Sequence, residues 1–214
     1  MKPLVVIVAV FMCLSCASLP KLDPAGGAFD CPAPFLTEKT RLIHAIEARV
    51  AGRVSSVIGV TLADPAERAM SVAIVGTEGL SLFEADSKNG EIAVKRALPP
   101  FDQHDFARGM MSDIELIFFA PQPVHRHQGL DEAGCRVCRY AAPKEGFTDV
   151  SEVEDGVYRI RRYSPGMALK REVTIRGDRG ERFAQIDLQA YERVRYRLIM
   201  TLLEAETVSG AATK

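Results

Sequence analysis

Apolar residues recur at every second position in many stretches of this chain, which is the period of a β-strand with one buried face. Residues 41–50 are an example, because the alternate positions from Leu42 to Val50 hold apolar side chains and one histidine, His44. A short helix over residues 38–48 also fits this stretch, but the alternation favours a strand. The chain is therefore predicted to begin its folded part with β-structure.

Further β-favouring stretches follow at the spacing of hairpins. Turn-favouring pairs such as Glu78-Gly79 and Asn89-Gly90 separate them, and such pairs suit tight connections between antiparallel strands. A meander is thus predicted, with strands over residues 54–62, 69–77, 80–85 and 91–96.

The period changes after Pro99 and Pro100, where apolar residues recur at helical spacing. Asp102 or Asp105 is suited to cap a helix that ends before Pro121. One face of this helix is continuously apolar and must cover another apolar surface. The residues on that face are Phe106, Met110, Ile114, Ile117 and Phe118.

The β-period returns near the end of the chain, after a segment of residues 121–155 that shows no clear period and is predicted to be irregular. The later strands are predicted over residues 157–163, 170–176, 182–188 and 193–203. The order of strands, helix, loop and strands predicts an α+β fold with an antiparallel sheet and a covering helix.

The first residues are typical of an export signal. An apolar run over residues 4–14 follows Lys2 and is too short to span a bilayer. Because Ser15 precedes Cys16, the end of the run resembles the lipobox of bacterial lipoproteins, which predicts a lipid on Cys16. Ala17, in place of the Asp that often retains a lipoprotein in the inner membrane, favours the outer membrane. An ordinary signal peptide cleaved nearby, which releases a soluble protein, is the alternative.

This interpretation divides the chain into four parts. Residues 1–15 are the signal peptide, and residues 16–37 are the lipidated cysteine with a flexible tether rich in proline and glycine. Residues 38–206 form a single β-rich domain, and residues 207–214 are a flexible tail. The mature protein is then anchored in the outer membrane and faces the periplasm.

Composition is that of an ordinary globular protein, with 47% hydrophobic residues, 26% charged residues and a net charge of −1. Nothing in this balance suggests a nucleic-acid partner. Residues 159–197 nevertheless hold eleven Lys or Arg against five Asp or Glu. This basic stretch suits either solvated strand faces or contact with anionic headgroups.

Two histidines and two cysteines lie close together in the predicted loop, at His125, His127, Cys135 and Cys138. These are ligand types that zinc prefers, although the spacing matches no known zinc signature. In an oxidising compartment a disulfide between Cys135 and Cys138 is favoured over a metal site or a redox-active pair. Cys31 is then left over, and it is able to pair with either of them or with another chain.

Enzyme signatures are missing from the sequence. No serine lies in a nucleophile elbow, and the segment from Gly76 to Gly79 lacks the lysine and the length of a phosphate-binding loop. The expectation is a protein that is not an enzyme and holds neither a cofactor nor a metal.

The lipobox, the segment from Ile74 to Phe83, the Leu98-Pro99-Pro100 break and the helix with residues 112–116 together resemble the LolA/LolB group of lipoprotein carriers and receptors. Within that group the chain is most similar to the outer-membrane lipoproteins of aryl-polyene gene clusters. The resemblance implies a strongly curved antiparallel sheet, an incomplete barrel, whose concave face is covered by helix and takes up acyl chains.

The expected function is therefore to bind or receive lipid, lipoprotein acyl chains or another hydrophobic cargo in a cavity between sheet and helix. The apolar helix face from Phe106 to Phe118 is expected to line that cavity, and a periplasmic carrier protein is a possible donor. Two alternatives stay open: a structural or interaction lipoprotein without cargo, and a metal- or redox-linked protein that uses the loop from His125 to Cys138.

Overall fold

The computed structural model describes residues 19–103, 105–142, 144–178 and 180–208 of the 214-residue chain. The predicted signal peptide of residues 1–15, the predicted lipidation site Cys16 and most of the predicted tail therefore lie outside the described residues. So does His104.

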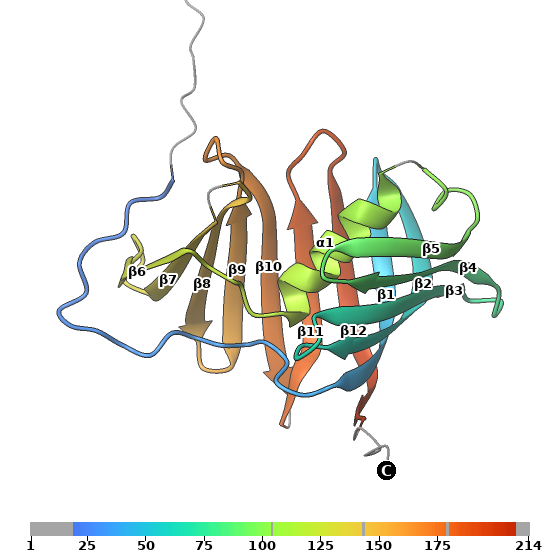
Figure 1. Cartoon of the computed structure of the whole chain (residues 1–214), viewed down its shortest axis with the longest axis horizontal. Helices are drawn as coiled ribbons and strands as arrows, with labels where there is room; N and C mark the ends of the chain where they lie inside the picture. Colours follow the sequence, from blue (N-terminus) through green and yellow to red (C-terminus); the bar gives the residue numbers. More distant parts are fainter. Residues whose placement is uncertain (1–18, 104, 143, 179, 209–214) are drawn as a thin grey trace, which may run out of the picture.

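The strands form one antiparallel sheet of twelve strands in the order β5-β4-β3-β2-β1-β12-β11-β10-β9-β8-β7-β6. Figure 1 shows that the sheet is strongly curved and that its edge strands, β5 and β6, lie at opposite ends. Nearly every strand pairs with its neighbour in sequence, and the pairing of β1 with β12 joins the two halves. The strands are β1 (Thr40–Val50), β2 (Arg53–Asp64), β3 (Ala69–Gly76), β4 (Ser81–Lys88), β5 (Glu91–Ala97), β6 (His125–Leu130), β7 (Arg136–Ala142), β8 (Gly146–Glu154), β9 (Val157–Tyr163), β10 (Leu169–Asp178), β11 (Glu181–Ala190) and β12 (Tyr196–Thr207).

The predicted curved antiparallel sheet and its helix are confirmed, but the balance between them is not that of an α+β fold. Among the described residues α1 (Phe106–Phe118) is the single helix, so the fold is dominated by its sheet. The prediction of an irregular segment over residues 121–155 was wrong, because β6, β7 and β8 lie there. A buried ion pair between Arg139 and Asp149 lies on the outer face of these strands, beneath the strap residue Pro20. Because both faces hold buried residues there, the expected alternation is hidden.

The core lies between α1 and the concave face of the sheet. Four fully buried residues from four adjacent strands, Val150, Ile160, Val173 and Leu188, stand side by side across the sheet. At the C-terminal end of α1, Phe118 packs edge-on against Phe183 of β11, with ring centroids 5.1 Å apart. The apolar face of the helix thus covers the apolar surface that its pattern required.

The described part of the predicted tether lies against the sheet instead of extending freely. Asp23 pairs with Leu130 of edge strand β6, with backbone N–H to O distances of 2.9 and 2.8 Å. Further along, Phe35 is buried, and the N–H of Leu36 donates to the carbonyl of Phe118 at 3.0 Å. Residues 19–39, here called the strap, therefore connect the β6 edge with the end of α1 (Figure 1).

A disulfide fixes the strap to the sheet. It joins Cys31 to Cys138 of β7 across 107 positions of sequence, and Cys135 is a free thiol. The predicted pair of Cys135 with Cys138 was wrong, and of the alternatives considered for Cys31 the structure shows its pairing with Cys138. Cys138 is an inward-facing, fully buried strand residue, whereas Cys135 lies in the turn before β7.

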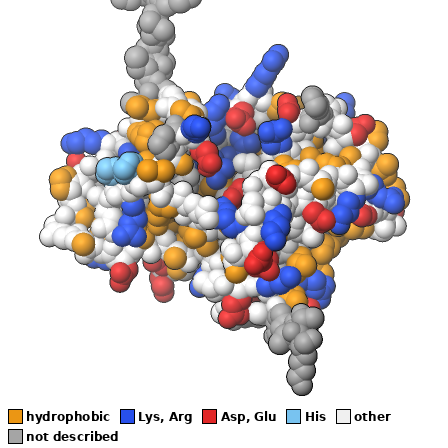
Figure 2. All heavy atoms as spheres, in the orientation of Figure 1, with side chains coloured by type: hydrophobic (Ala, Val, Ile, Leu, Met, Phe, Trp, Pro, Cys, Tyr) orange, Lys and Arg blue, Asp and Glu red, His pale blue; other side chains and the backbone are white. Residues whose placement is uncertain are grey.

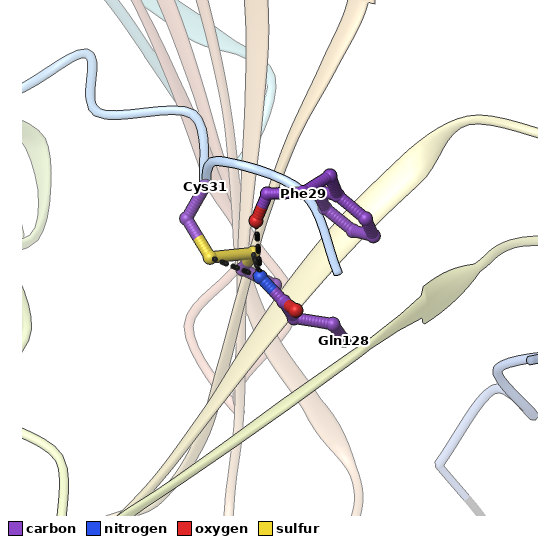
Figure 3. Close-up of a disulfide and its surroundings, with 4 residues drawn as sticks. Phe29, Cys31 and Gln128 are labelled. Carbon is purple, nitrogen blue, oxygen red and sulfur yellow. Dashed lines mark hydrogen bonds between the residues drawn. A yellow bond between two sulfur atoms is a disulfide. The ribbon is translucent and has the colours of Figure 1, made fainter. Parts of the chain in front are cut away.

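Gln128 of β6 completes this junction, as Figure 3 shows. Its side-chain Nε2 donates to the carbonyl of Phe29 at 2.5 Å and lies 3.4 Å from the sulfur of Cys31. The strap is consequently held by a covalent bond and by a polar contact at the same place.

We predict that Cys31→Ser lowers the free energy of unfolding by about 2–4 kcal/mol, because the unfolded chain loses a crosslink that closes a long loop. Denaturant unfolding without reductant measures the change. Cys135→Ser is the matched control and is expected to leave stability unchanged. Equal destabilisation by the two substitutions would contradict the observed pairing.

Candidate functional site

The five predicted cavity residues all lie in the interface between α1 and the sheet. Ile117 and Phe118 are 2% exposed, whereas Phe106, Met110 and Ile114 are half-buried and pack against the same core. Phe106 meets Phe83 of β4 edge-on, with ring centroids 5.7 Å apart. The structure thus brings these residues together along one seam.

The side chains of that seam pack against one another in this conformation. A surface depression of about 650 Å³ lies where β2 and β4 end and β3 and β5 begin. A much smaller one lies between the strap and the outer side of β8 and β9. Neither is lined by a residue of α1, so neither of these two depressions gives cargo a route beneath the helix in this conformation.

A buried polar cluster, which the sequence analysis missed, interrupts the apolar seam at the middle of α1. Asp113 of the helix accepts a hydrogen bond from Nε of Arg171 of β10 at 2.7 Å, and from the hydroxyl of Tyr196 of β12. Nη1 of Arg171 also donates to Glu192 at 2.7 Å. Three separate parts of the chain therefore meet at one carboxylate.

The cluster satisfies charges that would be costly to bury alone. Burial raises the pKa of the Asp113 carboxyl above its ordinary value, while Arg171 and Tyr196 oppose that rise. Because only one position of α1 brings Asp113 to both partners, the cluster fixes the placement of the helix on the sheet. A carboxylate among the apolar positions of the helix was the signal in the sequence.

Arg162 of β9 lies beside this cluster but has a different set of partners. Its Nη1 donates to the hydroxyl of Ser112 at 2.9 Å. With the described residues it forms no ion pair, and neither its Nε nor its Nη2 makes a hydrogen bond. Burial lowers the pKa of Arg162, and the nearby carboxylates of Glu115, Asp113 and Glu145 oppose that shift. Among the described residues none of these carboxylates forms an ion pair with Arg162, whereas Arg171 is paired with two.

His44 of β1 is a second unusual polar group on the concave face. Its side chain is 3% exposed, and the centroid of its ring lies 6.2 Å from that of Phe118. Its Nε2 has no hydrogen-bond partner among the described residues. Burial lowers the pKa of His44 to about 4. The imidazole is therefore neutral near pH 7 and forms part of the core next to the end of α1.

The loop from His125 to Cys138 does not assemble the zinc ligands considered from the sequence. His127 pairs with Arg139, and Cys138 pairs with Gln128, so the imidazoles and Cys138 project from opposite faces of the sheet. The sulfur of Cys138 is also committed to the disulfide. Within the described ranges no group of three or more His, Cys, Asp or Glu is placed to hold a metal ion.

The Asp113–Arg171 pair generates a prediction on stability. Asp113→Ala is expected to lower the free energy of unfolding by about 3–5 kcal/mol, because it leaves Arg171 buried with Glu192 alone. The double variant with Arg171→Met should cost clearly less than the sum of the single changes. Denaturant unfolding of all four proteins measures this coupling, and additive effects would disprove it. Removing Glu204, the exposed partner of Arg41, is the control and is expected to change stability far less, because water screens an exposed ion pair.

His44 generates a prediction on pH dependence. The unfolded chain takes up a proton near pH 6.5 and the folded protein only near pH 4. The neutral His44 therefore contributes its full share to the free energy of unfolding above pH 6.5. About 3 kcal/mol of this free energy is lost as the pH falls to 4. Compared with His44→Leu, the parent protein should lose this additional stability between pH 7.5 and 4. His127→Leu, at an exposed strand position, should behave like the parent, and parallel pH profiles of parent and His44→Leu would refute the assignment.

No helix among the described residues has both the length and the apolar character to cross a membrane. The amino-acid sequence matches no protein-family model and no curated protein. The comparison of folds, by contrast, finds solved structures with a similar arrangement.

A crystal structure of a LolA superfamily protein from Nitrosomonas europaea is similar to this chain, with a TM-score of 0.54 and 12% identity over 82% of this chain and 88% of that one. A DUF1329 family protein from Desulfovibrio piger is less similar, with a TM-score of 0.46 and 11% identity over 81% of this chain and 88% of that one. At such identities the first likeness concerns the fold alone. The chain thus has the curved sheet and helix of a LolA-like fold.

Proposed function

We propose that this protein is a non-enzymatic carrier or receptor of hydrophobic cargo, anchored in the outer membrane through a lipid on Cys16. The observation that carries the proposal is the apolar seam between α1 and the concave face of an open, LolA-like sheet. The proposed cargo is lipid, the acyl chains of lipoproteins, or an aryl-polyene product. A soluble periplasmic carrier is the proposed donor.

The helix is the element that cargo has to displace. One backbone hydrogen bond, from Leu36 to Phe118, joins α1 to another described element. Leu36 belongs to the strap, and the contacts of α1 with the sheet are made by side chains. A helix held in this way is able to leave the sheet as a unit, without breaking the hydrogen bonds between strands.

An acyl chain is a suitable replacement for the apolar face of the helix. Each methylene buried contributes about 0.8 kcal/mol, so a chain of typical length compensates for the loss of several partly buried side chains. Transfer from a carrier then requires only that the receptor binds the cargo more tightly. No catalytic residue or cofactor is needed.

A structural lipoprotein without cargo is the second candidate, and the packed seam favours it. The two candidates differ in whether α1 yields to a ligand. Binding of a neutral hydrophobic probe, N-phenyl-1-naphthylamine, to the chain with Cys16→Ser distinguishes them, because this variant carries no lipid of its own. Extraction and mass spectrometry of the same material test for co-purified lipid.

Two helix positions provide a sharper test. Ile114→Glu, at a half-buried position, is expected to melt close to the parent yet to bind the probe at least about tenfold more weakly, because a carboxylate repels apolar cargo. Ile117→Glu, at a fully buried position, is expected to unfold the protein. Melting curves and probe titrations measure both.

Ile114→Gln is the matched control, since it has the same length without the charge and should retain more binding than Ile114→Glu. Absence of probe binding and of bound lipid in the parent would reject the carrier function and favour the structural one.

A further inference from the structure

A row of polar side chains crosses the concave face of the sheet at one side of the apolar seam. Strand register places its members directly opposite one another on neighbouring strands, from the β6 edge to β10. The row consists of Arg126, Tyr140, Thr148, Arg162 and Arg171.

The next inward-facing row is apolar over most of its length. It contains Val150, Ile160 and Val173, all fully buried. Only two residues along each strand separate the rows, or about 7 Å. The concave face therefore changes from cationic to apolar over the distance that separates the headgroup of an amphiphile from the first part of its chain.

The three arginines of the row differ in how their charges are compensated. Asp113 and Glu192 neutralise Arg171. Arg162 has the hydroxyl of Ser112 as its hydrogen-bond acceptor among the described residues, and its Nε and Nη2 are not fully enclosed. Arg126 is exposed and forms no ion pair with a described residue.

Figure 2 shows Lys and Arg side chains interspersed with Asp and Glu on the face of the molecule toward the viewer. An excess of positive charge is therefore not a general property of this surface. The distinctive feature of Arg162 is its position: a half-buried guanidinium with unused donors, one row away from the seam and beside α1. Guanidinium groups in such places bind carboxylates and phosphates through paired hydrogen bonds.

We propose that Arg162 binds the anionic headgroup, a carboxylate or a phosphate, of an amphiphile whose acyl chain occupies the apolar seam. This inference rests on the proposed function and narrows its cargo to anionic lipids. Arg126, at the open edge of the same row, attracts the headgroup without needing to contact it, whereas Arg171 keeps its place in the cluster with Asp113.

Displacement of N-phenyl-1-naphthylamine from the full-length Cys16→Ser chain tests the proposal. The competitors are oleoyl lysophosphatidate and oleate, which are anionic, mono-oleoylglycerol, which is neutral, and inorganic phosphate alone. In the parent the anionic lipids are expected to compete at about tenfold lower concentration than the glyceride. Inorganic phosphate is expected not to compete.

Arg162→Gln should bring this preference to about one by weakening the anionic lipids only. Arg159→Gln is the matched control, because Arg159 lies on the same strand but on the opposite face and pairs across to Ser151; its preference should stay tenfold. Arg162→Lys keeps the charge and the stem but lacks the planar donor pair, so it should reduce the preference partly. If Arg162→Gln does not fold, the lipid preference of Arg162→Lys tests the proposal in its place.

Three results overturn the assignment. One is an unchanged preference in Arg162→Gln, or in Arg162→Lys if that variant has to decide. The others are an equal loss in Arg159→Gln, and competition by inorganic phosphate as strong as that by the anionic lipids. If mono-oleoylglycerol competes and the parent shows no preference, the headgroup site is wrong while the carrier function stands. If no lipid competes, the carrier function itself fails, and the headgroup site fails with it.

Discussion

Pairing of β1 with β12 is the interaction on which the rest of the structure depends. It joins the meander β1–β5 to the meander β6–β12 through a long ladder that begins at Thr40 and Thr207. Each meander consists of local hairpins and has two edges of its own. Only their union gives one curved sheet wide enough for α1 to lie against a continuous concave face, with Leu42 of one half and Met200 of the other in the same core.

The sequence was informative where the two faces of an element differ clearly in polarity. The meander β1–β5, the helix and the later strands follow from alternation and turn residues, and so does the apolar face from Phe106 to Phe118. Strands β6–β8 escaped detection because polar residues such as Thr148 and Arg139 occupy buried positions there. The partner of Cys138 could not be identified from the sequence, because the strap that carries Cys31 shows no periodic pattern to indicate where it lies on the sheet.

The polar groups of the candidate site were hidden for a related reason. Asp113 and Arg171 lie 58 positions apart. The place of Asp113 among apolar helix positions indicated burial, but nothing local identified the arginine that it meets. Their value lies in specificity: an apolar helix on an apolar sheet is able to slide, whereas a helix with one buried ion pair has a single position. If the protein is the proposed carrier, its closed state is defined in this way, and cargo must provide enough binding free energy to move the helix out of that state.

The strap has a further consequence for how the domain stands on a membrane. If Cys16 carries the proposed lipid, only six residues separate it from Asp23, the first residue that pairs with the sheet. Such a segment reaches at most about 25 Å. The lipid anchor therefore limits how far the domain is able to move from the membrane. The β6 edge is then kept close to the bilayer surface, the domain has a preferred orientation, and the far edge at β5 is directed into the periplasm, where an incoming carrier would meet it first.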